Sequence, residues 1–433
     1  MGFYYCCWDR EGFAKNRFTL NIVMSMKSSL YSIKLLWQQN KSLFIIVLLT
    51  SLMAGNAVGY ISYIPAWKYI LAAGLWYAVL CFPYKSCSLK QYYDIDKSLI
   101  KILAILAFIS IFSVPFRDDS FIYESNASYG NKYISWLVNP LSIFMFYPLL
   151  YLTIQSNVKY VKEVFLALFV SVVFCVFFSF FSQYYENHIF FFLPLLYPIY
   201  KYNKVLFGIA VIFFLLKATA VLGLARVHTL YFIFAVIAYF CCIKFKSNHY
   251  VKYAVIIIIL LPLFYALKAY LYGESVFSLL EEASKEKGLN QDTRTFLYEE
   301  LFLDLHLNND FMFGKGCHSF YFSDFFDTKN FLAGYRNGVE VPVLNWLLKA
   351  GFIYCLIYLI LFIRAIYFSI WHSKSWFLKT CGILLAGDFF LQFVGDMIGP
   401  YFFQIMIWTM MGMGLSNYWR NLSDNEIKNI IIR

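Results

Sequence analysis

The sequence predicts an all-α integral membrane protein that carries one large polar insert. Its 433 residues are 61% hydrophobic and only 14% charged, and they include 48 Phe and 36 Tyr. This composition exceeds what the core of a soluble protein needs. Apolar runs of about 20 residues recur along the chain, and such a run matches the roughly 30 Å hydrocarbon core of a bilayer. We therefore expect one polytopic membrane domain, residues 1–433, with about twelve transmembrane helices.

The predicted spans follow one another with short connections, except before the tenth. They are residues 42–62, 64–84, 98–116, 135–154, 164–183, 189–200, 205–222, 229–243, 251–271, 341–363, 376–398 and 401–416. The sixth run is too short to cross a bilayer straight unless flanking aromatic residues extend it. The number of transmembrane helices depends most on two pairs of runs, 189–200 with 205–222 and 376–398 with 401–416.

The positions of Lys and Arg predict which ends of the spans face the cytoplasm. With the N-terminus inside, every short inner loop is basic, and most of the 36 Lys and Arg fall on that side. Both termini are therefore expected in the cytoplasm and the insert outside. The net charge of +11 follows from this bias and from attraction to anionic membrane lipid, so it requires no nucleic-acid partner.

The polar insert, residues 272–340, lies between the ninth and tenth spans. Apolar spacing within it predicts helices at 275–287 and 293–305, with Asp292 as a cap for the second. The turn Gly314-Lys315-Gly316 breaks that pattern, and residues 320–331 follow as an aromatic loop or interfacial helix. Chemistry on a polar group is most easily housed in such a segment, so we expect the active site there.

Cysteine and histidine spacing indicates neither a disulfide framework nor a metal centre. Only Cys317 among the ten cysteines falls in an outer segment, and no CxxC or Cys/His pattern is present. The basic N-terminal region lacks a small-residue cleavage site after an apolar core, so no cleaved leader is expected. The cysteine and histidine pattern therefore predicts no zinc site.

Several short motifs occur in a particular order between residues 205 and 363. Leu222-Gly223-Leu224-Ala225-Arg226 ends the seventh span, Arg294 opens an insert helix, and Phe313-Gly314-Lys315-Gly316 forms the glycine turn. The run Glu340-Val341-Pro342-Val343-Leu344-Asn345-Trp346-Leu347-Leu348-Lys349-Ala350-Gly351 leads into the tenth span. In this order the chain resembles the O-antigen polymerase and O-antigen ligase superfamily of membrane glycosyltransferases, and the polymerases in particular.

The resemblance implies a membrane enzyme of the bacterial inner membrane that acts in lipopolysaccharide or related surface polysaccharide biosynthesis. A glycan on undecaprenyl pyrophosphate would be transferred to an acceptor glycan at the periplasmic face, without metal or nucleotide. A chain-length regulator protein is an implied partner. The family's two arginines fall on Arg226 and Arg294, which would bind the pyrophosphate. The ligase branch carries a His-Asn pair where this chain has Glu340 and Val341, a departure that disfavours the ligase.

The chemistry of glycosyl transfer is compatible with these side chains. Breaking an anomeric C–O bond to pyrophosphate requires cations on the departing charge, and arginine supplies a planar fork that stays charged. Arg336 is therefore a third candidate beside Arg226 and Arg294. A carboxylate or imidazole must accept the hydroxyl proton, and Glu340 and His318 are the candidates.

Blander interpretations stand beside each of these. Arg226 would also serve as an interfacial anchor, the other two arginines as members of surface ion pairs, and Glu340 and His318 as ordinary polar surface. Asp396 lies inside a predicted span and would be either a site residue or part of a structural pair. A ligase and a flippase for lipid-linked oligosaccharides are the alternative functions.

Overall fold

The computed structural model describes residues 94–113, 145, 158–178, 191–199, 208, 226–272, 295–323, 335–336, 338–395 and 402–432. Most of these residues are helical. The helices are α5 (Asp94–Ser113), α10 (Val158–Phe178), α11 (Leu193–Ile199), α13 (Arg226–Ala238), the π-helix η8 (Tyr239–Lys244), α14 (Asn248–Tyr272), α16 (Thr295–Leu307), α18 (Pro342–Trp371), α19 (Trp376–Val394), α20 (Phe402–Leu415), α21 (Asn417–Asn421) and α22 (Asp424–Ile432). Two short strands, β1 (Tyr321–Phe322) and β2 (Tyr335–Arg336), pair antiparallel.

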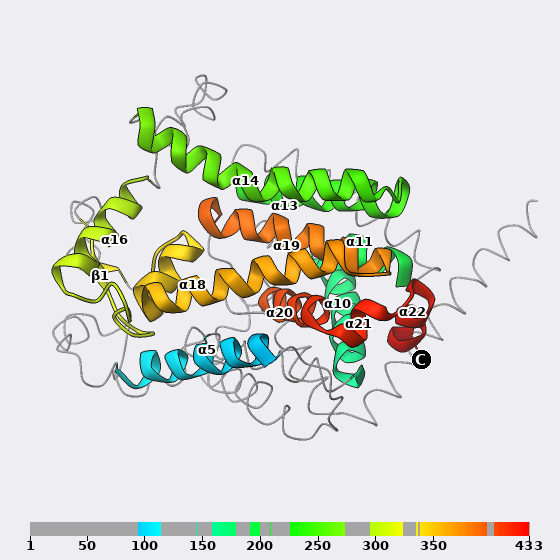
Figure 1. Cartoon of the computed structure of the whole chain (residues 1–433), viewed down its shortest axis with the longest axis horizontal. Coiled ribbons are helices and arrows are strands. Elements are labelled where there is room, and N and C mark those ends of the chain that lie inside the picture. The colour runs from blue at the N-terminus through cyan, green and yellow to red at the C-terminus, as the bar shows by residue number, and fades with distance from the viewer. Residues whose placement is uncertain are drawn as a thin grey trace, which may run out of the picture.

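The long helices α13, α14, α18 and α19 run along the longest axis of the molecule, with α5 below them (Figure 1). Helix α19 is the most central, because α13, α14, α18 and α20 all pack against it. Helix α10 instead crosses this set steeply and packs against α22 and α20. The parallel helices form the framework that holds the insert at one end.

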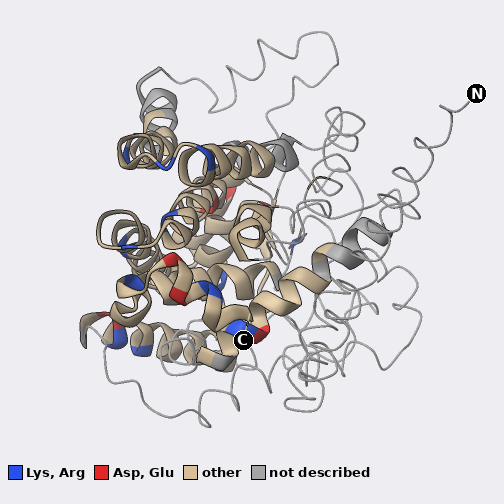
Figure 2. Cartoon of the chain, turned by 90° about the vertical axis from the view of Figure 1, so that its right-hand side faces the viewer, with Lys and Arg blue, Asp and Glu red and all other residues tan. Residues whose placement is uncertain are grey.

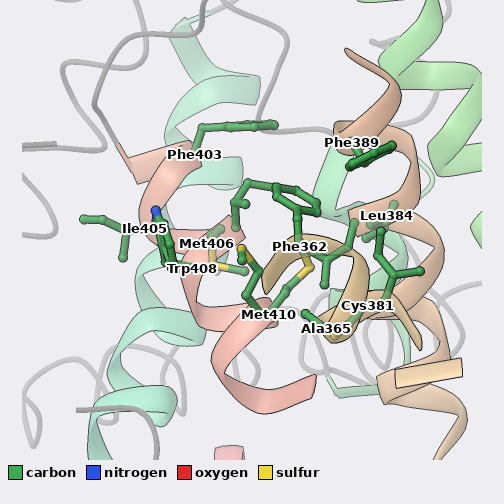
Figure 3. Packing of buried hydrophobic residues seen from close by; sticks show 14 of the residues in the cluster. Phe362, Ala365, Cys381, Leu384, Phe389, Phe403, Ile405, Met406, Trp408 and Met410 are labelled. Atoms are coloured by element: carbon green, nitrogen blue, oxygen red, sulfur yellow. The ribbon is translucent and has the colours of Figure 1, made fainter. Parts of the chain in front are cut away.

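The core between α18, α19 and α20 is built from aromatic and sulfur-containing side chains (Figure 3). Phe362 of α18 is fully buried, and its ring lies 5.9 Å from that of Phe389 on α19. Met406 and Met410 of α20 are fully buried in the same cluster. Methionine fills irregular gaps between large rings, which fits this mixture of residues.

Two of the described helices, α18 and α19, are long and apolar enough to cross a membrane. Helix α18 also exposes an apolar row at helical spacing, namely Phe352, Leu356, Ile360, Ile363 and Tyr367. Helices α5 and α14 expose similar rows, Ile102, Ile105, Ile109 and Phe112 on the first and Tyr253, Ile257, Leu260 and Phe264 on the second. Rows of exposed apolar side chains on neighbouring helices indicate a membrane protein, since water-facing helices rarely carry them.

Basic residues lie at the end of the parallel helices away from the insert. One end holds the insert elements α16 and β1, and the other holds α21, α22 and the last described residues (Figure 1). At the second end Lys374 N donates to Arg420 O at 3.0 Å, and Lys379 Nζ donates to Asn248 Oδ1 at 2.7 Å. Figure 2 faces this end and shows several Lys and Arg there. The sequence places Lys374, Lys379 and Arg420 on the inner, cytoplasmic side.

The helices match the predicted spans in part. Eight predicted runs, from 98–116 onward, have a helix at the corresponding place, and the helix predicted at 293–305 is observed as α16, shifted by two residues. Runs 42–62 and 64–84 and nearly all of 135–154 and 205–222 lie outside the described residues, as do 275–287 and Asp292. The count of about twelve spans therefore stays a prediction. The sequence predicted a loop or an interfacial helix at 320–331. The structure instead has a short strand at residues 321–322.

Candidate functional site at the insert end of the helix bundle

Helix α18 is broken at Gly351, within the predicted tenth span. Gly351 has φ 80° and ψ 179°, which no helical residue adopts. The break frees the carbonyls of Leu348 and Lys349 from their usual partners four residues on. The glycine turn of the insert replaces those partners, because Lys315 N donates to Leu348 O at 2.7 Å and Gly316 N donates to Lys349 O at 3.1 Å.

The amides freed on the other side of the break are also satisfied by the insert. Phe352 N donates to Phe311 O at 2.9 Å, and Ile353 N to Met312 O at 3.4 Å. The two carbonyls and two amides that the break would leave unpaired thus all find hydrogen-bond partners in residues 311–316. Because an unpaired buried peptide group costs free energy comparable to a lost hydrogen bond, the insert and α18 stabilise each other's backbone.

Two glycines make this close approach possible. A Cβ at Gly314 would lie 2.6 Å from Gly351 N, and a Cβ at Gly351 would lie 2.5 Å from Gly314 N. Gly314 also has a positive φ of 71°. Any side chain at either position would push the insert away from α18, so the Gly-Lys-Gly turn and Gly351 form one structural unit.

Lys349, two residues before the break, had no predicted role in the site. It is 1% exposed, and its Nζ donates to Ser319 O at 2.7 Å. Its own carbonyl accepts a second bond, from Ser110 Oγ of α5 at 2.6 Å, and Cys317 N donates to Ser110 O at 3.1 Å. A buried ammonium is costly unless it is held by polar groups. Lys349 therefore ties the insert to both α18 and α5.

The glycine turn is held on its other side by α16. Lys315 Nζ lies 2.5 Å from Asp304 Oδ2, and both side chains are largely buried. Tyr298, also on α16, donates its hydroxyl to Phe393 O at the end of α19 at 2.7 Å. Helix α16 is thus fixed between the turn and the helix bundle.

A second polar cluster surrounds the β1–β2 ladder, in which Tyr321 pairs with Arg336. Arg336 Nη2 lies 3.4 Å from Glu340 Oε1, and Ser323 Oγ donates to Glu300 Oε2 at 2.5 Å. Burial raises the pKa of Tyr321 to about 12, with Arg336 opposing the rise and both glutamates adding to it. The Tyr321 hydroxyl thus stays protonated at physiological pH. The cluster combines a cation, two carboxylates and a neutral hydroxyl donor.

The backbone next to Glu340 is fixed by the start of α18. Pro342 occupies the first turn of the helix, a position that suits its fixed φ. Asn345 is fully buried, and its Oδ1 accepts from Val339 N at 3.2 Å. The side chain of Glu340 itself is 46% exposed. A carboxylate on a rigid backbone but open to solvent can meet an incoming hydroxyl.

The structure brings only some of the predicted site residues together. Arg336 and Glu340 are brought together, whereas His318 is only 4% exposed, with its ring 6.0 Å from that of Phe320. Arg226 is the first residue of α13. Arg294 and Asp396 lie outside the described residues.

The backbone of Arg226 lies at the insert end of the bundle. Helix α13 and the π-helix that continues it run antiparallel to α19, because Phe234 lies beside Gly387 and Cys242 beside Thr380. The start of α13 is therefore level with the end of α19, where the insert helix α16 is bonded. This is the end at which the sequence placed Arg226.

Sequence reasoning missed Lys349, Glu300 and Tyr321 as members of the site. The signal for Lys349 was available, because a lysine within the apolar run Leu347-Leu348-Lys349-Ala350 must be held by polar partners. Tyr321 and Glu300 carried no such local signal, since Tyr321 meets Arg336 through the β1–β2 ladder and Glu300 meets Ser323 only in the fold.

Among the described residues, no group of three or more His, Cys, Asp and Glu side chains is arranged to hold a metal ion. Comparison with protein-family models, with curated proteins and with solved structures finds no match to this chain. We therefore infer the function from the geometry of the insert end and from the order of the motifs.

Proposed function

We propose that this protein is a membrane glycosyltransferase that polymerises oligosaccharide repeat units carried on undecaprenyl pyrophosphate. The observation that carries the proposal is the pairing of Arg336 with Glu340 on a rigid turn directly before the apolar helix α18. A lipid-linked substrate presents its charged pyrophosphate and its sugar at such a boundary between polar and apolar surfaces. A cation and a base are the groups that its transfer requires.

In the proposed reaction, the acceptor hydroxyl oxygen attacks the anomeric carbon of the donor sugar. The C–O bond to pyrophosphate breaks, and its electron pair leaves with the pyrophosphate, whose growing charge Arg336, Arg226 and Arg294 stabilise. Glu340 accepts the hydroxyl proton. We favour Glu340 over His318 as the base because the carboxylate is exposed and the imidazole is buried. The reaction needs no metal and no nucleotide.

The proposed location is a bacterial inner membrane. About twelve spans, with both termini in the cytoplasm and the insert in the periplasm, follow from the positive-inside pattern. The positions of Lys374, Lys379 and Arg420 at the end opposite the insert support this orientation. A chain-length regulator protein would meet the enzyme in the same membrane.

The glycan profile of a deletion strain tests the function. Loss of a polymerase leaves a single repeat unit on the lipopolysaccharide core, whereas loss of a ligase or a flippase leaves none. The wild-type gene should restore long chains and an Arg336→Ala gene should not, while Lys374→Ala, an exposed residue at the opposite end, serves as the matched control. A bare core in the deletion strain would replace the polymerase with one of the two alternatives.

A further inference from the structure

Helix α16 carries large apolar side chains on its outer side as well as on its inner face. Its inner face buries Leu297, Leu301 and Leu305 completely. Its outer face nevertheless exposes Phe302, Leu303 and Leu307, the last two at 60% and 70%. Large apolar side chains exposed together on one side of a helix indicate that something apolar covers them.

The exposed surface continues into the loop that follows α16. Met312 and Phe313 are 52% and 56% exposed, directly before the glycine turn. We call these five residues, Phe302, Leu303, Leu307, Met312 and Phe313, the insert patch. A group of large exposed apolar side chains this close in the chain marks an interaction surface rather than scattered apolar residues.

An aromatic stack joins the insert patch to the exposed row of α18. The ring of Phe311 lies 5.8 Å from that of Phe302 and is stacked on Phe352 at 5.4 Å. Phe352 is the first member of the row that continues through Leu356 to Tyr367. The hydrogen bond from Phe352 N to Phe311 O fixes this junction. The insert patch is therefore an extension of the face that α18 turns toward lipid.

The ionisable groups of α16 are arranged so that this face can enter a membrane interface. Asp304 is paired with Lys315, and Glu300 accepts a hydrogen bond from Ser323, so neither carboxylate is left unpaired. Glu299 and His306 are exposed on the outer side of the helix. Polar groups beside apolar ones on one helix are typical of an element at the level of the lipid headgroups, where the former reach water and the latter reach the acyl chains.

We propose that the insert patch is immersed in the bilayer, in contact with the upper acyl chains of the phospholipid leaflet on the insert side. The insert is then not a water-surrounded cap but a platform set into the membrane surface, and α18 breaks at Gly351 where this platform joins it. A substrate held in the membrane by a hydrocarbon chain would approach along the same face. Immersion of the patch depends on the membrane location of the protein and not on the reaction.

Photolabelling of the full-length protein in phospholipid vesicles tests the inference. A phospholipid with a diazirine near the start of one acyl chain is activated by light, and the labelled peptides are identified by mass spectrometry. Adducts are expected on residues 302–313 as well as on the 352–367 row, which is the internal positive control. The peptide that contains 335–340 should remain unlabelled.

A double variant, Leu303→Glu with Leu307→Glu, provides the matched control. Both side chains point outward, so the core of α16 is retained and the adducts on 352–367 should persist while those on 302–313 are largely lost. Adducts confined to 352–367 in the wild-type protein would overturn the proposal, whether the patch then faces water or another protein segment. Glycan synthesis is not measured, so a failure of the proposed enzymatic function leaves this result intact.

Discussion

At the scale of single residues, the proposed reaction makes Glu340 the base that accepts the hydroxyl proton. Replacing Glu340 with Gln keeps the size and the backbone of the turn but removes the basicity, so chain elongation should fall by about 10²- to 10⁴-fold. His318→Ala is the comparison, because His318 is the other candidate and is buried. Both effects are read from the length distribution of surface glycans at matched protein levels. A normal distribution in Glu340→Gln together with a lost one in His318→Ala would reassign the base to His318.

Lys349 is predicted to stabilise the insert end through its buried hydrogen bond to Ser319. In a Lys349→Met protein the buried Ser319 carbonyl loses its donor, and an unsatisfied group of this kind costs about 1–3 kcal/mol. The thermal unfolding temperature in detergent should therefore drop. Lys374→Met, an exposed lysine just beyond the opposite end of α18, should change stability by less than about 0.5 kcal/mol. Equal melting temperatures for the two variants would show that the bond to Ser319 contributes nothing.

At the scale of elements, the break in α18 is the feature that the insert depends on. Alanine at position 351 would have to adopt a φ/ψ combination that is essentially confined to glycine, which alone costs about 1–3 kcal/mol. Its Cβ would also meet Gly314 N at 2.5 Å. We expect Gly351→Ala to lower the free energy of unfolding and to speed amide exchange at Phe352 and Ile353. Gly208→Ala is the control, since no atom lies within 4 Å of the position that its methyl group would take. A wild-type exchange pattern in Gly351→Ala would contradict the mutual stabilisation of the glycine turn and α18.

The elements also show which parts of the structure sequence reasoning can reach. Helix α16 was predicted within two residues because its apolar spacing is a local property of the chain. The break at Gly351 was not predicted, because it requires the 311–316 backbone to supply hydrogen bonds from a distant segment. Arg336 and Glu340 are only four residues apart, and each was chosen singly, but their pairing was not predicted.

At the scale of the whole molecule, the two ends of the helix bundle are expected to face opposite sides of the membrane. A reporter fused near Asp310 should register as external and one near Lys246 as cytoplasmic, because the short loops predicted on the side away from the insert are basic. Enzymatic reporters that are active on one side only give the readout. Cytoplasmic activity of the fusion at position 310 would place the proposed site on the wrong side for a lipid-linked glycan.

The central claim is that the insert end joins glycans carried on polyprenyl pyrophosphate, and reconstitution measures this directly. Purified protein in vesicles is supplied with undecaprenyl-pyrophosphate-linked repeat units and a metal chelator, and the lipid-linked products are separated by size. We expect a ladder of multiples of the repeat unit with the wild-type protein and no ladder with Glu340→Gln. Substrate that stays a single repeat unit with the folded wild-type protein, or that only changes leaflet, would contradict the claim.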